Sequence, residues 1–442
     1  MSKIKYFIGS FLIILGISTN RIVLEKFVSP YAIIELNYRI PIILINLVLI
    51  TLGISFIALK KEHFQKEKIV NWYKFLSYNF FAAFLIFIFC NLFFYGLYVI
   101  RDTSFHKDQI FFSYNKPLKE LYPDLKGRQV NLLLYETWSR PYVYEPYTQF
   151  KEKSFKGKYV NVHETGFRFS KDQGVWPPDP KNINIFLFGG STTFGYGVPD
   201  DETIASHLQD VLSLQRDKSR CCSVYNFGRG NYFSSQERIL FENLLKEGFV
   251  PDVAIFIDGL NDFYYFNNEP LFTERFRKFV DFKGKTLLVD LPLVNVIRDI
   301  KKIADVEHDK PDEAYDNPQV LKAVIDRYLK NKQLIEAAAE SFKVKTLFVW
   351  QPVPTYKYDL KYHIFAGRGF GRFLFSKYGY AYMEDLLKRN SLGTNFLSLA
   401  GMQEGMKKAL YVDIDHYSSE MSDKIAKRIY NFLSEGGYYG FK

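Results

Sequence analysis

The feature that most restricts the fold of this chain is a run of 25 residues, Leu76–Ile100, without a charged side chain. A second uncharged run, Ile40–Leu59, has 20 residues. At a rise of ~1.5 Å per residue, each can cross a hydrocarbon layer about 30 Å thick as a helix. Core helices are seldom apolar on every face, so the longer run predicts a transmembrane helix. Tyr6–Asn20 is uncharged over only 15 residues and fits a third span, a buried helix or a signal peptide.

A lysine-rich loop between the two long runs indicates their orientation. Lys60–Lys74 contains five lysines, and short loops of this kind stay in the cytoplasm by the positive-inside rule. The run that follows then leaves the cytoplasm, so the chain after Arg101 is expected outside. We therefore expect a multi-pass membrane protein with two to three transmembrane helices in residues 1–100.

The composition is that of a folded chain with more than one structural unit. The 442 residues are 48% hydrophobic and 18% aromatic, which excludes disordered, collagen-like and coiled-coil chains. Three cysteines exclude a disulfide scaffold. The net charge is +10, but the lysines are dispersed and no nucleic-acid-binding motif is present. Together with the expected topology, this argues against nucleic acid as a partner.

Short apolar runs alternate with helical periodicity from Asn182 onward. Four runs are interpreted as buried strands: Ile183–Leu187, Ser223–Phe227, Val253–Ile257 and Val344–Trp350. Ser234-x-x-Glu237 is interpreted as a capping box that opens a helix, and Ser418 or Ser419 as the cap of the last helix. This alternation predicts an α/β domain over residues 182–442, with a parallel sheet covered by helices on both faces.

Three other stretches do not follow the alternation. Residues 101–181 are rich in aromatic residues and proline and are expected to form a membrane-proximal linker or accessory segment. Residues 263–314 and 356–405 interrupt the α/β pattern. Insertions after sheet strands often build a substrate site or a lid.

Small and polar residues follow the expected strands, at the edge of the sheet where α/β proteins bind ligands. Gly190-Ser191 follows the first strand, the turn Asn226–Asn231 the second, and Gly259-Leu260-Asn261-Asp262 the third. A later apolar run leads into Asp413-Ile414-Asp415-His416. Each segment alone is compatible with an ordinary turn or helix cap, but the four occur in one order, each at the expected end of a strand.

These segments contain the groups that activate a hydroxyl nucleophile. Such a nucleophile needs a base, and the base needs an orienting carboxylate. Ser191, His416 and Asp413 fit these roles, whereas the adjacent Asp415 is expected to point elsewhere. The side-chain amide of Asn261 and backbone N–H groups at Ser191 and in the Gly228–Asn231 turn can stabilise an oxyanion. No histidine pair has the spacing of metal ligands, so no metal or other cofactor is expected.

The four segments resemble the Ser, Gly, GxND and DxxH blocks of the SGNH hydrolase superfamily, also called GDSL-like esterases, over about Asn182–Leu433. The resemblance implies a flavodoxin-like parallel sheet and ester hydrolysis through an acyl-enzyme. It further implies that Ser191 is the nucleophile, His416 the base and Asp413 its orienter. The oxyanion hole would comprise Ser191, Gly230, Asn231 and Asn261.

Two positions depart from the pattern of that family. Gly190 stands where the family has the Asp of its GDS motif. The last glycine of the family's N-x-G-x-x-G block aligns with Asn231, unless Gly230 takes its place by a shift of one residue. A backbone N–H is the donor in either case.

The span-plus-domain layout, with the stretch Tyr159–Arg168 before the Ser block, looks like membrane-anchored SGNH proteins of bacterial envelopes. We therefore expect a membrane-anchored serine esterase that acts on an acylated carbohydrate or lipid outside the cytoplasm. One alternative is an O-acyltransferase, which would need a partner membrane acyltransferase because three spans are few for an acyl channel. The other is a non-catalytic, glycan-binding scaffold.

Overall fold

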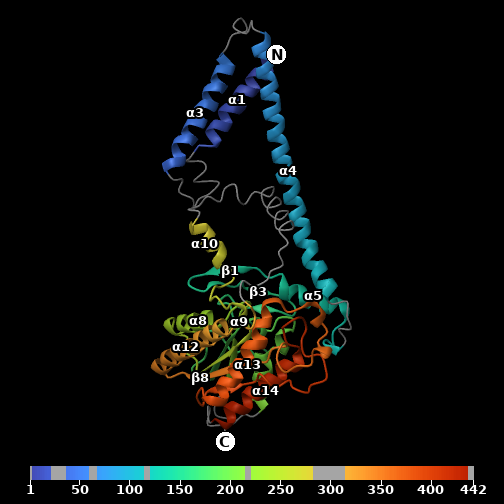
Figure 1. The fold of residues 1–442 in the computed structure, drawn as a ribbon, viewed down its shortest axis with the longest axis vertical. Coiled ribbons are helices and arrows are strands. Elements are labelled where there is room, and N and C mark those ends of the chain that lie inside the picture. The colour runs from blue at the N-terminus through green and yellow to red at the C-terminus, as the bar shows by residue number, and fades with distance from the viewer. Residues whose placement is uncertain are drawn as a thin grey trace. The chain divides into compact units, whose positions relative to one another are not determined.

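The computed structural model describes residues 2–20, 36–58, 67–113, 120–214, 221–281 and 314–436 (Figure 1). It divides into two compact units. The first comprises Met1–Ser104 and Glu274–Glu307, and the second comprises Phe105–Thr273 and His308–Lys442.

The first unit contains the apolar helices α1 (Ser2–Ser18) and α3 (Leu36–Ala58) and most of α4 (Glu67–Ser113). Helices α1 and α3 pack closely, since a Cβ at Gly9 would lie 2.8 Å from the carbonyl oxygen of Gly53. Within the described residues, only Ser77–Leu97 is long and apolar enough to cross a membrane. The other two apolar segments, Ile8–Ser18 and Ile42–Ala58, are shorter than the runs expected from sequence, so more than one membrane span is not established.

The second unit is built on a five-stranded parallel sheet with the order β6-β5-β7-β8-β9. The strands are β5 (Ile183–Gly189), β6 (Cys222–Asn226), β7 (Val253–Asp258), β8 (Lys345–Trp350) and β9 (Phe396–Ser398). Counted along the chain, this is the 2-1-3-4-5 order of flavodoxin-like folds. The order reverses between β5 and β7, so the carboxyl ends of these two strands flank the point where such folds bind ligands.

Helices cover both faces of the sheet because side chains of successive strand residues point to opposite sides. Ile185, Leu187 and Ile255 pack with α7 (Ile204–Leu214) and α14 (Ser419–Glu435). Phe186 and Phe188 pack with α8 (Ser234–Lys246) and α12 (Pro318–Phe342) on the other face. Helices α8 and α12 lie side by side (Figure 1). The expected α/β class with a parallel sheet is confirmed.

The four expected strands are present with ends shifted by one or two residues, and β9 is an addition. The predicted capping box is wrong. Phe233, which has no side-chain acceptor, stands at the cap position of α8, and the Ser234 hydroxyl donates to Asp262 Oδ1 at 2.5 Å. At the last helix, the Ser418 hydroxyl accepts from the backbone N–H of Met421, so Ser418 is the cap.

The residues expected to form a linker contain a helix, α5 (Gly127–Trp138), and two antiparallel strand pairs. The strands are β1 (Tyr142–Glu145), β2 (Gln149–Glu152), β3 (Phe155–Lys156) and β4 (Asn161–Val162). Phe150 and Phe167 are buried among the aromatic side chains of the sheet. The Arg168 N–H donates to the carbonyl oxygen of Asn226 at 2.9 Å, which attaches this segment to the end of β6.

The remaining helices and turns lie after β5 or in and next to the two stretches expected as insertions. They are α6 (Ser191–Phe194), α9 (Leu260–Tyr264), α10 (Thr273–Asp281) and α13 (Leu374–Arg389), with 3₁₀ turns at Asp200–Glu202, Leu360–Tyr362, Ala366–Arg368 and Gly371–Phe373. Most of the first insertion, residues 282–313, lies outside the described residues. The second contains α13 and β9.

Candidate active site

Ser191, His416 and Asp413 form a hydrogen-bonded chain at the carboxyl edge of the sheet. Ser191 is the first residue of α6 and directly follows the end of β5. His416 Nε2 lies 2.7 Å from Ser191 Oγ. On the other side of the ring, Nδ1 lies 2.7 Å from Asp413 Oδ2 and 2.9 Å from Oδ1. A serine hydroxyl is thereby linked to a base, and the base to a carboxylate, within hydrogen-bond distance.

Hydrogen bonds within the loop Asp413–His416 hold the proposed base in place. Asp413 Oδ1 accepts the N–H groups of Asp415 at 3.0 Å and of His416 at 2.9 Å. The Val412 N–H donates to the carbonyl oxygen of His416 at 2.8 Å, which closes the loop just before α14. The short spacing from Asp413 to His416 thus lets one carboxylate shape the turn and orient the imidazole.

The prediction that Asp415 points away from His416 is wrong. Its Oδ1 lies 3.3 Å from His416 Nδ1, so two carboxylates face the same ring nitrogen. Burial and the neighbouring Asp413 raise the pKa of Asp415 to about 7, although His416 opposes this rise. The expectation failed because the Asp413-centred turn directs both side chains inward.

The two carboxylates set the protonation of the base. Burial alone lowers the pKa of His416, but Asp413 and Asp415 outweigh burial and raise it to about 9. The pKa of Asp413 stays below its ordinary value: burial raises it, and His416 with the backbone N–H groups more than offsets this. An imidazolium that forms during a reaction is therefore strongly stabilised at this position.

Two aromatic rings enclose His416. Tyr196 stacks on the imidazole with a centroid distance of 5.2 Å, and Trp138 contacts it edge-on at 5.4 Å. Trp138 ends α5 and is 39% exposed, so it also forms part of the surface beside the base. Neither residue was singled out from the sequence, because Trp138 belongs to the segment interpreted as a linker.

The side-chain amide of Asn261 lies next to the nucleophile. Asn261 Nδ2 donates to the carbonyl oxygen of Tyr232 at 2.7 Å, and an amide carries a second N–H. A Cβ at Gly190 would lie 2.4 Å from the same Nδ2. A side chain at position 190 would therefore collide with the Asn261 amide. This is a physical reason why glycine stands here in place of the Asp of the family's GDS motif.

Gly230 and Asn231 differ in whether their N–H groups are already bonded. The Gly230 N–H donates to Glu152 Oε1 at 3.2 Å. Asn231 adopts a left-handed backbone with φ 62°, which asparagine tolerates better than most residues. Within the part of the chain that the structure describes, its N–H makes no hydrogen bond. Of the two predicted donors, Asn231 is therefore the one whose N–H is available to a further acceptor.

A buried carboxylate, Glu152, holds this turn. Its Oε1 also accepts the Tyr196 hydroxyl at 3.0 Å, and its Oε2 lies 3.4 Å from Arg140 Nη2. The Asn231 side chain donates to the Tyr142 hydroxyl and accepts from the Tyr265 hydroxyl, both at 2.9 Å. Because Tyr196 also stacks on His416, one network connects the oxyanion turn with the base.

Arg168 fixes the chain that follows Ser191. Its side chain is fully buried, and Nε donates to Asp200 Oδ1 at 2.8 Å. Nη1 donates to the carbonyl oxygens of Phe194 and Gly195, and Nη2 to that of Val198. Arg168 is the last residue of the stretch Tyr159–Arg168, which resembles a segment of membrane-anchored SGNH proteins. Its hydrogen bonds hold the backbone that follows Ser191.

Three buried carboxyl groups surround the start of α9, the helix that contains Asn261. Burial raises the pKa of Glu237 and of Asp258 well above the ordinary values. The neighbouring Asp258 and Asp262 add to the rise at Glu237, whereas at Asp258 the charge of Asp262 adds to it and the hydrogen bond with Glu237 opposes it. Asp262 is held by the Ser234 hydroxyl, and Arg327 Nη2 lies 3.8 Å from its Oδ1. This buried cluster was not predicted, since Glu237 was assigned to a helix cap.

Among the described residues, one group of His, Cys, Asp and Glu side chains has ligand atoms close enough for a metal ion. It consists of Asp413, Asp415 and His416, within 4.8 Å of one another. These are the residues of the triad loop. Their hydrogen bonds to one another and to Ser191 account for their arrangement.

Solved structures similar to this chain come from GDSL-type lipolytic proteins and esterases. A lipolytic protein of the G-D-S-L family from Desulfitobacterium hafniense has 13% identity and a TM-score of 0.31, covering 57% of this chain and 100% of its own. An acetyl xylan esterase has 13% identity and a TM-score of 0.31, covering 56% and 98%. A GDSL-like lipase from Bacteroides thetaiotaomicron has 13% identity and a TM-score of 0.32, covering 59% and 92%.

No family profile matches the sequence, and no curated protein matches it. Two of these three structures carry in their names the GDSL family that the four sequence motifs resemble.

Proposed function

We propose that this chain is a serine ester hydrolase of the SGNH type that removes acyl groups from a carbohydrate or lipid. The observation that carries the proposal is the chain of two short contacts, Ser191 Oγ to His416 Nε2 and His416 Nδ1 to Asp413, each 2.7 Å at its shortest. An isolated serine hydroxyl is a weak nucleophile, and this arrangement is what activates it.

The residues perform the reaction in two halves. Ser191 Oγ attacks the ester carbonyl while His416 Nε2 takes the hydroxyl proton, and Asp413 stabilises the imidazolium. His416 then returns the proton to the leaving alcohol, which departs and leaves an acyl group on Ser191. Water attacks this acyl-enzyme with His416 again as the base, which releases the carboxylic acid and restores the serine.

The negative charge on the carbonyl oxygen is received by donors from three strand ends. They are the N–H groups of Ser191 and Asn231 and the free amide hydrogen of Asn261, after β5, β6 and β7 respectively. Donors fixed before the reaction need no reorganisation when the charge develops. The network of Glu152, Tyr142 and Tyr265 around Asn231 supplies that rigidity.

A fluorophosphonate probe and a small ester test the proposal. The full chain should hydrolyse p-nitrophenyl acetate and be labelled at Ser191, and Ser191→Ala should abolish both. Ser341→Ala, an exposed serine near the end of α12, is the matched control and should behave as the unaltered chain. Turnover by folded Ser191→Ala at the unaltered rate would refute the proposal. Free acetic acid as the product, with no acylated alcohol, separates hydrolysis from acyl transfer.

We further propose that the N-terminal helices anchor the chain in a membrane. The second unit, which contains Ser191 and His416 and is called the catalytic unit below, would then lie outside the cytoplasm. The apolar helix Ser77–Leu97 and the lysine-rich residues 60–74 that precede it support this orientation. Protease added to intact cells should digest the catalytic unit in this orientation. Complete protection until the membrane is opened would contradict it.

A further inference from the structure

A second buried histidine, His363, contacts the loop that carries the proposed base. It follows the 3₁₀ turn Leu360–Tyr362, in the second of the two stretches expected as insertions. The residue is buried, and its Nε2 lies 3.1 Å from the carbonyl oxygen of Ile414. Ile414 directly follows Asp413 and precedes His416 by two residues, so this contact reaches the middle of the loop.

The hydrogen bonds of His363 indicate which ring nitrogen has the proton. The N–H of Phe365 donates to Nδ1 at 3.1 Å, so Nδ1 is the unprotonated nitrogen. Nε2 then has the hydrogen and donates it to the Ile414 carbonyl. Burial lowers the pKa of His363, and the Ile414 carbonyl and Asp413 only partly offset this, which favours the neutral ring. Each ring nitrogen is therefore bonded to a different segment of backbone.

The ring of His363 also packs on a residue that leads into the loop. It stacks on Tyr411 with a centroid distance of 5.2 Å and an interplanar angle of 14°. The Tyr411 hydroxyl donates to Gln403 Oε1 at 2.5 Å, which fixes the far end of this ring. His363 therefore contacts the chain on both sides of Asp413, by ring stacking before it and by a hydrogen bond after it.

The Ile414 carbonyl belongs to the same peptide unit as the N–H of Asp415. That N–H donates to Asp413 Oδ1 at 3.0 Å, while the carbonyl accepts from His363. A peptide unit is planar, so holding both of its polar groups prevents it from rotating. Within the part of the chain that the structure describes, no backbone N–H donates to this carbonyl, so the contact with His363 is not duplicated by the backbone.

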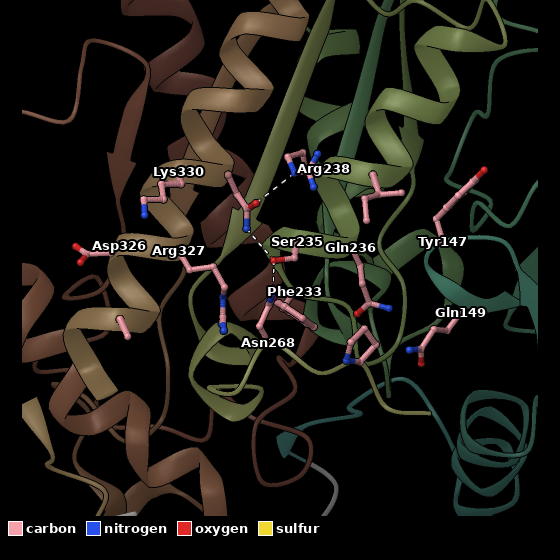
Figure 2. A pocket seen from close by; sticks show the side chains of 14 residues that line it. Tyr147, Gln149, Phe233, Ser235, Gln236, Arg238, Asn268, Asp326, Arg327 and Lys330 are labelled. Carbon is pink, nitrogen blue, oxygen red and sulfur yellow. Dashed lines mark hydrogen bonds between the residues drawn. The ribbon is translucent and has the colours of Figure 1, made fainter. Parts of the chain in front are cut away.

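The second insertion does not line the cavity next to α8 and α12. This cavity has a volume of about 710 Å³ and is lined by residues of α8, α12, the β1–β2 turn and the loop after α9, among them Arg238 and Lys330 (Figure 2). None of its lining residues belongs to residues 356–405. The insertion therefore forms no wall of this cavity, whereas its contact with the triad loop is direct.

We propose that His363 is a positioning residue: by holding the Ile414 carbonyl, it keeps the carboxylate of Asp413 directed at the base. Without this contact the peptide can rotate, which withdraws the Asp415 N–H from Asp413 and loosens the group that orients the imidazole. The inference rests on the proposed esterase function for its effect on turnover. The order of the loop can be measured separately, because it does not require the serine hydroxyl.

Two amide side chains separate the contacts of the two ring nitrogens. A glutamine amide reaches about as far as Nε2 and can still donate to Ile414, whereas an asparagine amide ends near Nδ1 and can only accept from Phe365. His363→Gln should keep kcat for p-nitrophenyl acetate within about threefold of the unaltered chain, and His363→Asn should lower it about 10- to 100-fold, the usual cost of a misplaced catalytic group. KM should change little, because the base acts in both halves of the reaction.

Tyr358→Phe is the matched control. It removes a hydrogen bond of 2.8 Å from the same insertion to another backbone carbonyl, that of Lys408, and keeps the ring. Its kcat should equal that of the unaltered chain. Unaltered kcat in folded His363→Asn, equal losses in the asparagine and glutamine variants, or an equal loss in Tyr358→Phe would overturn the inference and leave the esterase proposal intact.

Hydrogen exchange measures the loop without turnover, in the full-length Ser191→Ala chain in detergent. The amides of Asp415 and His416 donate to Asp413 and should exchange about fivefold to tenfold faster when His363→Asn is added, the size of one lost hydrogen bond. Adding His363→Gln instead should leave them protected. Unchanged exchange in the asparagine variant would overturn the inference. Faster exchange there, with no ester turnover by the unaltered chain, would overturn the esterase proposal and leave the role of His363 in the loop standing.

Discussion

Replacing Asp415 by asparagine should raise activity near neutral pH, although the residue touches the catalytic base. His416 must be neutral to accept the Ser191 proton, and its pKa is about 9. At pH 7 only about one molecule in a hundred would then have a competent base. The carboxylate of Asp415, 3.3 Å from Nδ1, is one of the two groups that hold the pKa this high.

The contact distance gives the size of the effect. Two unit charges 3.3 Å apart interact by roughly 5 kcal/mol at an effective dielectric constant of about 20. This is an upper bound near pH 7, because the pKa of Asp415 is itself about 7 and the group is only partly ionised there. We expect the Asp415→Asn variant to lower the pKa of His416 by about 1 to 2 units, since one unit corresponds to about 1.4 kcal/mol.

The assay is the pH dependence of kcat/KM for p-nitrophenyl acetate, which reports the pKa values of the free enzyme. In the unaltered chain kcat/KM should rise with pH and level off above about 9. In Asp415→Asn the rise should occur at lower pH, with a roughly tenfold gain at pH 7. Fluorophosphonate labelling of Ser191 should follow the same curve and avoids the background hydrolysis of the ester.

Asp413→Asn is the contrasting variant. It also removes a charge from Nδ1, but it loses the acceptor that fixes the tautomer and orientation of the ring. Its kcat should fall by about 10⁴ at every pH. An unchanged pH profile in folded Asp415→Asn would refute the electrostatic reasoning, and equal losses in the two variants would show that both carboxylates orient the ring.

Three further results are expected. Asn261→Ala should lower kcat about 10²–10³-fold with little change in KM, the usual effect of one oxyanion donor, measured with p-nitrophenyl acetate. Glu152→Gln leaves Arg140 buried beside a neutral amide, so unfolding in urea should reveal a loss of about 2–4 kcal/mol. Asp258→Asn should raise Tm increasingly as pH rises above about 4, because burial raises the pKa of this carboxyl and native stability falls as the group is forced to ionise.

The sequence predicted the parts of the fold that are determined locally. The runs that became β5, β7 and β8 are mostly apolar on both faces because helices cover both faces of the sheet, and such runs are visible without a structure. β9 was missed because Phe396–Ser398 is only three residues long and half-buried. The capping box failed because the hydroxyl of Ser234 bonds Asp262, a partner far along the chain.

The same distinction applies to the site. Ser191, Asn261, Asp413 and His416 were proposed from the sequence because each lies in a short motif, and the structure places Ser191, His416 and Asp413 within hydrogen-bond distance of one another. Trp138, Glu152 and Tyr196 act through contacts between distant segments, so no local pattern identifies them. The signal that was available was the aromatic content of residues 101–181, which is unusual for a linker.

The proposed nucleophile and its base are 225 residues apart along the chain. Ser191 follows the first strand of the sheet, whereas His416 arrives only with the loop before α14. During synthesis, the strands through β8 can therefore be complete while Ser191 is still an ordinary alcohol. In the proposed function the triad is complete only after the loop with Asp413 and His416 has joined the edge of the sheet, next to α14, which packs against α7. Cleavage of the chain just ahead of Asp413 would separate the proposed base from Ser191 while leaving all five strands in one fragment.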